Sequence, residues 1–293
     1  MRLLITGADG QLGRCLQDHL RGTGHVVRAC SRAELDITDP DSVKACLLSY
    51  RPDAVINAAA YTAVDRAEDD EASAAAVNAA AVGYLASGVN AIDATLVQVS
   101  TDYVFDGTGR EPYREEQPVK PLGVYGRTKL AGERAAQSAH KHFIVRTAWV
   151  FSEYGHNFLK TIVRLGAERE SLRVVSDQVG TPTYAGDLAA ALVAILENPV
   201  PFGTYHFSGG PACSWYDFAG YIFTQASRVL PGYRSPRLEP IATADYPTPA
   251  QRPQYSVLSD DKLRACLKHP GGDWQAGVVS ALTALGEDPP GGD

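Results

Sequence analysis

The chain has 293 residues, of which 45% are hydrophobic and 21% charged, and its 27 basic and 34 acidic side chains give a net charge of −7. This composition is typical of a folded protein with one large α/β unit or two domains, and it excludes a disordered chain. An acidic surface repels nucleic acid and anionic lipid, so we expect neither as a partner. A local basic pocket for one small anionic molecule remains compatible with this charge.

The cysteines and the apolar stretches indicate the compartment. The five cysteines are widely spaced and form no Cys-x-x-Cys pair, which argues against a disulfide framework and a zinc site. Residues 3–5 form an apolar run too short for a signal peptide. The alanine-rich stretch near 72–92 contains Asn78 and Asn90 and predicts a buried helix rather than a membrane span. We therefore expect a soluble, cytoplasmic protein that acts on small molecules.

Short apolar runs alternate with helical patterns in the first half of the chain. Strands are predicted at residues 2–6, 25–30, 54–57, 95–100 and 143–150. Helices are predicted between them at residues 11–21, 39–50, 72–91 and 125–138. Continuous apolar strands separated by helices predict βαβ units in a parallel sheet covered on both faces. The expected fold class is α/β, a Rossmann-type doubly wound parallel sheet with a smaller α/β C-terminal substrate domain.

The pattern becomes less regular after residue 151. Helices are predicted at 157–168, 185–197 and 214–227, strands at 172–176 and 203–208, and an ordered loop at 231–253. We expect residues 1–150 to form the first domain, with 178–200 returning to it. Residues 151–177 and 201–285 would form the substrate-binding domain, and 286–293 a frayed tail.

A glycine-rich motif at residues 6–13, Thr-Gly-Ala-Asp-Gly-Gln-Leu-Gly, follows the first predicted strand and opens the first helix. In this context glycines permit a tight turn and close approach of a pyrophosphate, which the helix N-terminus attracts. The spacing is Gly-x-x-Gly-x-x-Gly, and a glycine-rich turn without a ligand is the less favoured alternative. The predicted cofactor contacts in this motif are Gly7, Gly10, Gln11, Leu12 and Gly13.

The second predicted strand ends at Ser31 and Arg32, where dinucleotide-binding folds contact the adenosine ribose. A carboxylate at this position would favour a free 2′-hydroxyl, whereas a hydroxyl and a guanidinium suit the 2′-phosphate of NADPH. NADPH is therefore favoured. NADH stays possible, because Arg32 could instead be a solvated surface charge.

Two further segments are predicted to border the cofactor. Asp36 and Ile37 follow in a stretch that would lie beside the adenine. Ala58, Ala59 and Ala60 follow the third predicted strand, where small side chains let a ligand approach the backbone. For any single alanine, simple packing between helix and sheet is an equal explanation.

The candidate catalytic residues are Thr101, at the end of the fourth predicted strand, and Tyr125 and Lys129 on the following helix. Residues at i and i+4 share one helix face. A tyrosine has an ordinary pKa of about 10, and we expect a nearby ammonium to lower that pKa toward the working range. A Tyr-x-x-x-Lys pair is weak evidence alone, but behind a glycine-rich turn and a strand that ends in Ser-Thr it becomes a strong sign of a catalytic site.

This combination resembles the extended short-chain dehydrogenase/reductase family, and within it the branch of dTDP-4-dehydrorhamnose reductases. The matching segments are 5–13, 34–39, 51–68, 77–86, 99–107, 121–133, 146–151, 157–166, 174–189 and 246–259. The most specific are Tyr-Thr-Ala-Val-Asp, Ser-Thr-Asp-Tyr-Val-Phe-Asp-Gly and Asp-Gln-x-Gly-x-Pro-Thr. The resemblance extends from the first strand to near residue 285.

The resemblance implies reduction of the C4 ketone of dTDP-6-deoxy-L-lyxo-4-hexulose to dTDP-L-rhamnose by NADPH. It implies that residues 1–150 bind NADP, that Tyr125 donates the proton, that Lys129 holds the nicotinamide ribose, and that Thr101 tunes the tyrosine. The substrate contacts it implies are Thr62, Val64, Thr101, Asp102, Tyr103, Trp149, Asn157 and Arg252. Arg252 could equally be a structural ion-pair partner.

Some family members carry an acidic residue in the first helix that binds Mg²⁺ between two subunits, but here that region is Arg14-Cys15-Leu16. We therefore expect no metal, and either a monomer or a homodimer. Two alternatives remain. One is a sister dTDP-4-keto-deoxysugar reductase of antibiotic sugar synthesis, and the other is a non-catalytic regulatory subunit like the β subunit of methionine adenosyltransferase.

Overall fold

A six-stranded parallel sheet forms the centre of the computed structural model, which describes residues 1–268 and 271–287. Its spatial strand order is β10-β5-β4-β3-β1-β2, and every neighbouring pair is parallel. The strands are β1 (Arg2–Thr6), β2 (Val26–Cys30), β3 (Ala54–Asn57), β4 (Thr95–Thr101), β5 (His142–Thr147) and β10 (Gly203–His206). The chain order reverses between β1 and β3, which in doubly wound sheets opens a ligand-binding crevice at the carboxyl ends of the strands. The predicted α/β class is confirmed.

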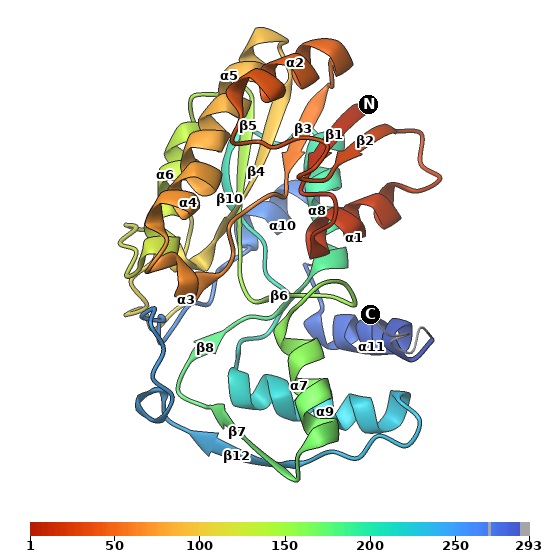
Figure 1. Ribbon diagram of the computed structural model, residues 1–293, viewed down its shortest axis with the longest axis vertical. Helices are drawn as coiled ribbons and strands as arrows, with labels where there is room; N and C mark the ends of the chain where they lie inside the picture. Colours follow the sequence, from red (N-terminus) through yellow and green to blue (C-terminus); the bar gives the residue numbers. More distant parts are fainter. Residues whose placement is uncertain (269–270, 288–293) are drawn as a thin grey trace.

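Helices cover both faces of this sheet (Figure 1). One face carries α1 (Gln11–Leu20) and α8 (Ala185–Glu197), and the other carries α2 (Pro40–Tyr50), α5 (Ala81–Ala91) and α6 (Val124–Ala136). Successive strand residues point to opposite faces, so Leu3 and Ile5 join the first core while Leu4 joins the second. Because both cores are apolar, the strands read as unbroken apolar runs.

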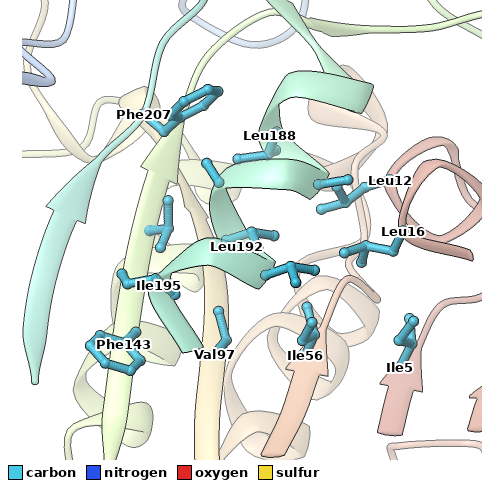
Figure 2. Packing of buried hydrophobic residues seen from close by; sticks show 14 of the residues in the cluster. Ile5, Leu12, Leu16, Ile56, Val97, Phe143, Leu188, Leu192, Ile195 and Phe207 are labelled. Carbon is cyan, nitrogen blue, oxygen red and sulfur yellow. The ribbon is translucent and has the colours of Figure 1, made fainter. Parts of the chain in front are cut away.

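The first core connects segments that are distant in the sequence. Figure 2 shows Leu188 and Leu192 of α8 packed between Leu12 of α1 and strand residues such as Ile56. Each such side chain is fully or nearly fully buried, which contributes about 1.5–3 kcal/mol per residue. Helix α8 therefore belongs to the layer beside the glycine-rich turn.

A smaller part of the molecule lies beyond the carboxyl edge of the sheet (Figure 1). It contains α7 (Phe158–Glu168), α9 (Trp215–Val229) and α11 (Trp274–Glu287), with β7 (Ser171–Val175) paired in parallel to β12 (Arg237–Ile241). Its separate apolar core includes Phe151, Phe218 and Trp274.

Short elements connect these parts. They are α3 (Val64–Ala67), α4 (Glu71–Ala75), the π-helical turn η1 (Ala76–Ala80), the 3₁₀ turns η2 (Asp102–Val104) and η3 (Thr243–Asp245), β6 (Val150–Phe151), β8 (Val179–Gly180), β9 (Thr183–Tyr184), β11 (Cys213–Ser214) and α10 (Asp261–Leu267).

Three sequence-based expectations differ from the structure. Strand β10 was expected in the substrate part, 201–285, but it pairs with β5 and forms the edge of the main sheet. The expected loop 231–253 contains β12, because the backbone of that segment pairs with β7. The expected tail 286–293 begins too early, since Gly286 and Glu287 end α11, whereas 288–293 lie outside the described residues.

One helical segment, Glu71–Ala91, is long and apolar enough to cross a membrane by length and composition alone. In the fold it runs through α4, η1 and α5, and packs against α2 and α6. The buried residues on its inner side include Ala74, Ala81 and Leu85. The predicted helix 72–91 is thus present as a covering helix of the sheet.

Candidate active site

The glycine-rich turn lies where the chain order of the sheet reverses. Gly7 has φ +69°, and a Cβ there would come within 2.7 Å of the Ala59 backbone nitrogen. A Cβ on Gly13 would come within 2.1 Å of the Gly7 carbonyl oxygen. Gly7 is therefore required for the turn conformation and Gly13 for the close contact between helix and turn. The close approach at Gly7 places Ala58 and Ala59 beside the turn.

The N-terminus of α1 is open to an anion. Its N-cap is Gly10, no side chain caps the helix, and its first turn contains no acidic residue. Unsatisfied backbone N–H groups and the helix dipole attract a phosphate at such an end. Leu12 is buried in the first core, so its predicted contact would come from its backbone.

The side chain of Gln11 is already engaged across the molecule. Its Oε1 accepts hydrogen bonds from Ser152 Oγ at 3.0 Å and from Asn157 Nδ2 at 2.8 Å. Gln11 therefore connects the glycine-rich turn to the start of α7. We infer that its role toward a cofactor would be through the backbone.

The end of β2 differs in one respect from the expected phosphate site. Arg32 is exposed and lies 3.8 Å from Asp36, but the backbone and hydroxyl of Ser31 both donate to Glu34 at 2.8 Å. These bonds lower the pKa of Glu34. A 2′-phosphate could bind Ser31 only by displacing the Glu34 carboxylate. Arg32 is therefore the side chain here that can donate to the phosphate without such a displacement. Ile37 is buried behind this loop.

Thr101, Tyr125 and Lys129 come together at the carboxyl edge of the sheet. The Thr101 hydroxyl lies in hydrogen-bonding contact with Tyr125, and the Tyr103 ring meets the Tyr125 ring edge-on at 5.4 Å. Lys129 is buried and donates from Nζ to the Val99 carbonyl oxygen at 2.7 Å. Strand β4 and helix α6 thus supply the two sides of one polar cluster.

The pKa of Tyr125 differs from the one expected from the sequence. Burial raises the pKa of Tyr125 above its ordinary value, the hydrogen bond between the Tyr125 and Thr101 hydroxyls opposes this, and the nearby Asp102 carboxylate adds to it. Burial lowers the pKa of Lys129 to about 8, while the nearby Glu133 opposes that shift. The expected lowering of the tyrosine pKa by Lys129 is not seen, because the lysine is directed at the Val99 carbonyl. Tyr125 therefore holds its proton at neutral pH, as a proton donor must.

Asp102 is a buried carboxyl group directly beside these residues. Its Oδ1 accepts from the Thr101 hydroxyl at 3.0 Å, whereas Oδ2 is buried without a partner among the described residues. Burial raises the pKa of Asp102 to about 6, and hydrogen bonds to Ser256 and Thr101 oppose the shift. An unsatisfied buried oxygen facing a reactive cluster is costly and marks a functional position.

Replacing Asp102 with Asn should change how stability depends on pH. With a folded-state pKa of about 6 and an ordinary value of 3.8, the native state binds more protons than the unfolded state between these values. The contribution of Asp102 is thus present below pH 3.8 and lost as the pH rises through 6. Relative to Asp102→Asn, the wild type should lose up to about 3 kcal/mol between pH 4 and pH 7.5. Urea unfolding of both proteins across this range measures the difference, and parallel profiles would contradict it.

A cavity of about 690 Å³ lies beyond the cluster, between α7, β7, β12 and the loop after η3. Three arginines, Arg169, Arg173 and Arg252, line it together with the aromatic side chains of Phe158 and Trp215. Its volume suits a nucleotide-sized ligand, the arginines suit phosphate, and the rings suit a base.

Arg252 forms the structural ion pair that was one of its two predicted roles, and it also lies at the cavity, where the other role would place it. It donates from Nη2 to Asp65 Oδ2 at 2.8 Å, and it lines the cavity. It also makes a hydrogen bond with the Tyr103 side chain, and its Nε is buried without a partner among the described residues. Arg252 therefore connects α3, the catalytic cluster and the cavity.

Trp149 and Asn157 both make contacts within the chain that the sequence did not predict. Trp149 has φ +47° and stacks on Trp215, which lines the cavity, at a ring distance of 3.5 Å. Gly180 makes room for it, since a Cβ there would lie 2.5 Å from the indole. Asn157 caps α7 through Lys160, besides its bond to Gln11, so a sugar contact would have to break one of these bonds.

The remaining predicted contacts belong to one loop. Thr62 is exposed and Val64 begins α3, both on the segment that carries Asp65. Ala60 is partly buried in the same loop, directly after Ala59. This loop lies between the cofactor side and the cavity side.

Asn78 was not among the predicted site residues, and it lies buried in the π-helical turn. Its amide donates to the Tyr61 carbonyl at 3.1 Å and to the Thr128 hydroxyl at 3.2 Å, and Thr128 donates to the Tyr125 carbonyl at 3.0 Å. A π turn inside an apolar helix frequently marks a functional site. The Asn in an otherwise alanine-rich stretch was the available signal.

No group of three or more histidine, cysteine or acidic side chains that could hold a metal ion occurs within residues 1–268 and 271–287. In the first helix, burial raises the pKa of Cys15 to about 12, so the thiol stays protonated.

The parallel sheet with a glycine-rich turn at its switch point, and the Thr101, Tyr125 and Lys129 cluster beside it, define an extended short-chain dehydrogenase/reductase fold. Residues 1–286 match the family described as RmlD substrate binding domain. The dTDP-4-dehydrorhamnose reductase of Aggregatibacter actinomycetemcomitans is 46% identical over 281 residues, covering 94% of this chain and 96% of the relative. The chain belongs to this family of dTDP-4-dehydrorhamnose reductases.

Two further similarities bear on ligands. A Bacillus anthracis dTDP-4-dehydrorhamnose reductase solved in complex with NADP has a TM-score of 0.91 and 37% identity, covering 97% of this chain and 99% of that one. A Streptomyces antibioticus protein described as a probable dTDP-4,6-dihydroxy-2-methyloxan-3-one 4-ketoreductase is 41% identical over 297 residues, covering 99% of this chain and 98% of the relative.

Proposed function

We propose that this protein reduces the C4 ketone of dTDP-6-deoxy-L-lyxo-4-hexulose to dTDP-L-rhamnose with NADPH, the last step of dTDP-L-rhamnose formation. The observation that carries the proposal is the cluster of Tyr125 with Thr101 and Tyr103, which Arg252 connects to the arginine-lined cavity. The two ligands would meet at the tyrosine hydroxyl. The identity of the sugar is taken from the family to which the chain belongs, and the residues of the cluster account for the reduction.

The proposed cofactor fits the residues present. The glycines let the strand, the turn and α1 pack closely where a Cβ would clash, α1 presents uncapped N–H groups, and Arg32 offers an exposed guanidinium for a 2′-phosphate. When bound, the reduced nicotinamide supplies the hydride for the ketone carbon.

The proton comes from the chain itself. Tyr125 is protonated at neutral pH and would donate its proton to the carbonyl oxygen, with Thr101 as hydrogen-bond partner. Lys129, with a pKa of about 8, is mostly charged at pH 7 and would bind the nicotinamide ribose and stabilise the phenolate left after donation. Asp102 and Tyr103 would line the sugar site, and Arg252 would bind the diphosphate. These roles together supply positioning and acid catalysis.

We also propose that the two ligands are bound by different parts of the chain. Residues 1–150 and α8 would hold the cofactor, and 151–177 with α9, α11 and β12 would hold the sugar nucleotide, supported by their separate apolar cores. Strand β10 and helix α10 are placed with the cofactor part, because they pack at the edge of the main sheet. A reducing, cytoplasmic location is also proposed, supported by five unpaired cysteines.

The test is to supply the enzymatically prepared 4-keto sugar nucleotide with NADPH and to identify the product. Loss of NADPH absorbance with dTDP-L-rhamnose as product supports the proposal. Loss of NADPH with another deoxysugar would instead support a sister reductase, which the similarity to the Streptomyces antibioticus ketoreductase favours as second candidate. Binding of NADPH without any consumption would support a regulatory protein.

Substitution of Arg32 tests the cofactor assignment. Arg32→Ala should weaken NADPH binding about tenfold and leave NADH binding unchanged, because a charge-assisted bond to the 2′-phosphate contributes about 1.5 kcal/mol or more. Glu34→Gln is the matched variant and should tighten NADPH binding, since it removes the carboxylate that holds Ser31. Fluorescence titration with both cofactors measures these changes. Equal losses for NADPH and NADH in Arg32→Ala would contradict the assignment.

A further inference from the structure

The helix that carries Tyr125 begins without a cap of its own. The N-cap of α6 is Gly123, no side-chain cap bond is formed by that residue, and the first turn contains no acidic residue. Uncapped N–H groups and the positive end of the helix dipole favour a nearby carboxylate. Tyr125 is the second residue of this helix, so the first turn determines where its hydroxyl lies.

The missing cap is supplied by Glu68, from the loop just after α3. Its Oε1 accepts the Val124 backbone N–H at 2.8 Å, one residue before the tyrosine. Gly123 has φ −119°, which any residue adopts, but a Cβ there would lie 2.5 Å from Glu68 Oε1. The glycine is therefore explained by the space that the carboxylate needs and not by backbone strain.

The same turn is also in tight contact with η2. A Cβ on Gly126 would come within 2.3 Å of the Tyr103 carbonyl oxygen, so the turn lies directly on η2. Glu68 thus caps the start of a turn whose next residues pack on η2. Loss of the carboxylate would free the start of the turn, and we expect it to shift Tyr125 relative to Thr101.

We propose that Glu68 is a positioning residue that caps α6 and holds the Tyr125 hydroxyl in its reactive place. The inference rests on the proposed reductase function for its kinetic part. Glu68 contacts no reacting atom, so its loss should reduce kcat and leave the KM for the sugar and the affinity for NADPH nearly unchanged.

Four variants of the full chain test this proposal. Glu68→Ala should lower kcat about 10- to 100-fold, and Glu68→Gln, which keeps an acceptor oxygen, should retain at least one third of wild-type kcat. Gly123→Ala keeps the carboxylate but displaces it, and should resemble Glu68→Ala. The control is Glu71→Ala. It removes an exposed carboxylate on α4 that pairs at 3.6 Å with Arg127 of α6, the helix that carries Tyr125, and it should change kcat less than twofold.

Amide hydrogen exchange at Val124 provides a readout that needs no turnover. Exchange there should be at least tenfold faster in Glu68→Ala than in the wild type, and unchanged in Glu71→Ala. Unchanged Val124 exchange, or a kcat within twofold of wild type in Glu68→Ala, would overturn the proposal, as would a Gln variant no better than Ala. If the wild type shows no reductase activity but Val124 still exchanges faster in Glu68→Ala, the proposed function would be contradicted and the capping role of Glu68 would stand.

Discussion

Replacing Tyr125 with Phe should lower kcat about a thousandfold while NADPH binding stays within twofold of wild type. The phenol is the group that donates the proton, and positioned acid catalysis contributes about 10²–10⁴-fold. The ring remains, so its edge-on contact with Tyr103 and the start of α6 are preserved. Stopped-flow turnover together with a cofactor titration measures both quantities.

The matched control is Tyr103→Phe, because its ring lies 5.4 Å from that of Tyr125 and its hydroxyl meets Arg252. This variant should raise the KM for the sugar nucleotide several-fold and change kcat little. A Tyr125→Phe protein with near-normal turnover would refute the assignment of the acid. Equal kcat losses in the two variants would show that the proton donor has been misassigned.

Replacing Glu133 with Leu should lower the free energy of unfolding by about 3–5 kcal/mol. Arg146 makes two parallel bonds of 2.8 Å to the Glu133 carboxylate, and the two side chains are only 6% and 3% exposed. Removing one partner of a buried pair leaves an uncompensated charge. His206 cannot replace the lost carboxylate, because an imidazole carries no negative charge; burial first and then Arg146 lower its pKa to about 3 and keep it neutral.

The double variant Glu133→Leu with Arg146→Met should recover most of that stability, because apolar replacement of a whole buried pair is often neutral. Activity should stay low in both proteins. Glu133 raises the pKa of Lys129 against the effect of burial, and it also accepts a hydrogen bond from Ser100, next to Thr101. Urea unfolding gives the free energies. A single variant within 1 kcal/mol of wild type would contradict the account of this pair.

The elements on the cofactor side could be predicted from the sequence because the motifs that identify them are local. The glycines, the strand before them and the helix after them all lie within residues 2–20, and Tyr125 and Lys129 share one face of α6. Such patterns depend on backbone periodicity and turn geometry, which a short stretch of sequence specifies.

The sugar side depended on contacts that no local pattern encodes. Asp65 and Arg252 are 187 positions apart and meet only because the loop after η3 folds back onto α3. Trp149 was expected against the ligand, and its stacking on Trp215 of α9 could not be predicted because the two residues are distant in the sequence. Strand β12 was missed because its pairing partner, β7, lies some sixty residues earlier.

Hydride transfer to the sugar is the central claim, and deuterium labelling tests it most directly. The protein would be given the 4-keto sugar nucleotide and NADPH carrying deuterium at nicotinamide C4, on each face in separate reactions, and the product would be examined by NMR. We expect dTDP-L-rhamnose with deuterium at C4 of the sugar from one labelled face and none from the other. An unlabelled product from both, or a label at a different carbon, would contradict the reaction proposed for Tyr125 and its neighbours.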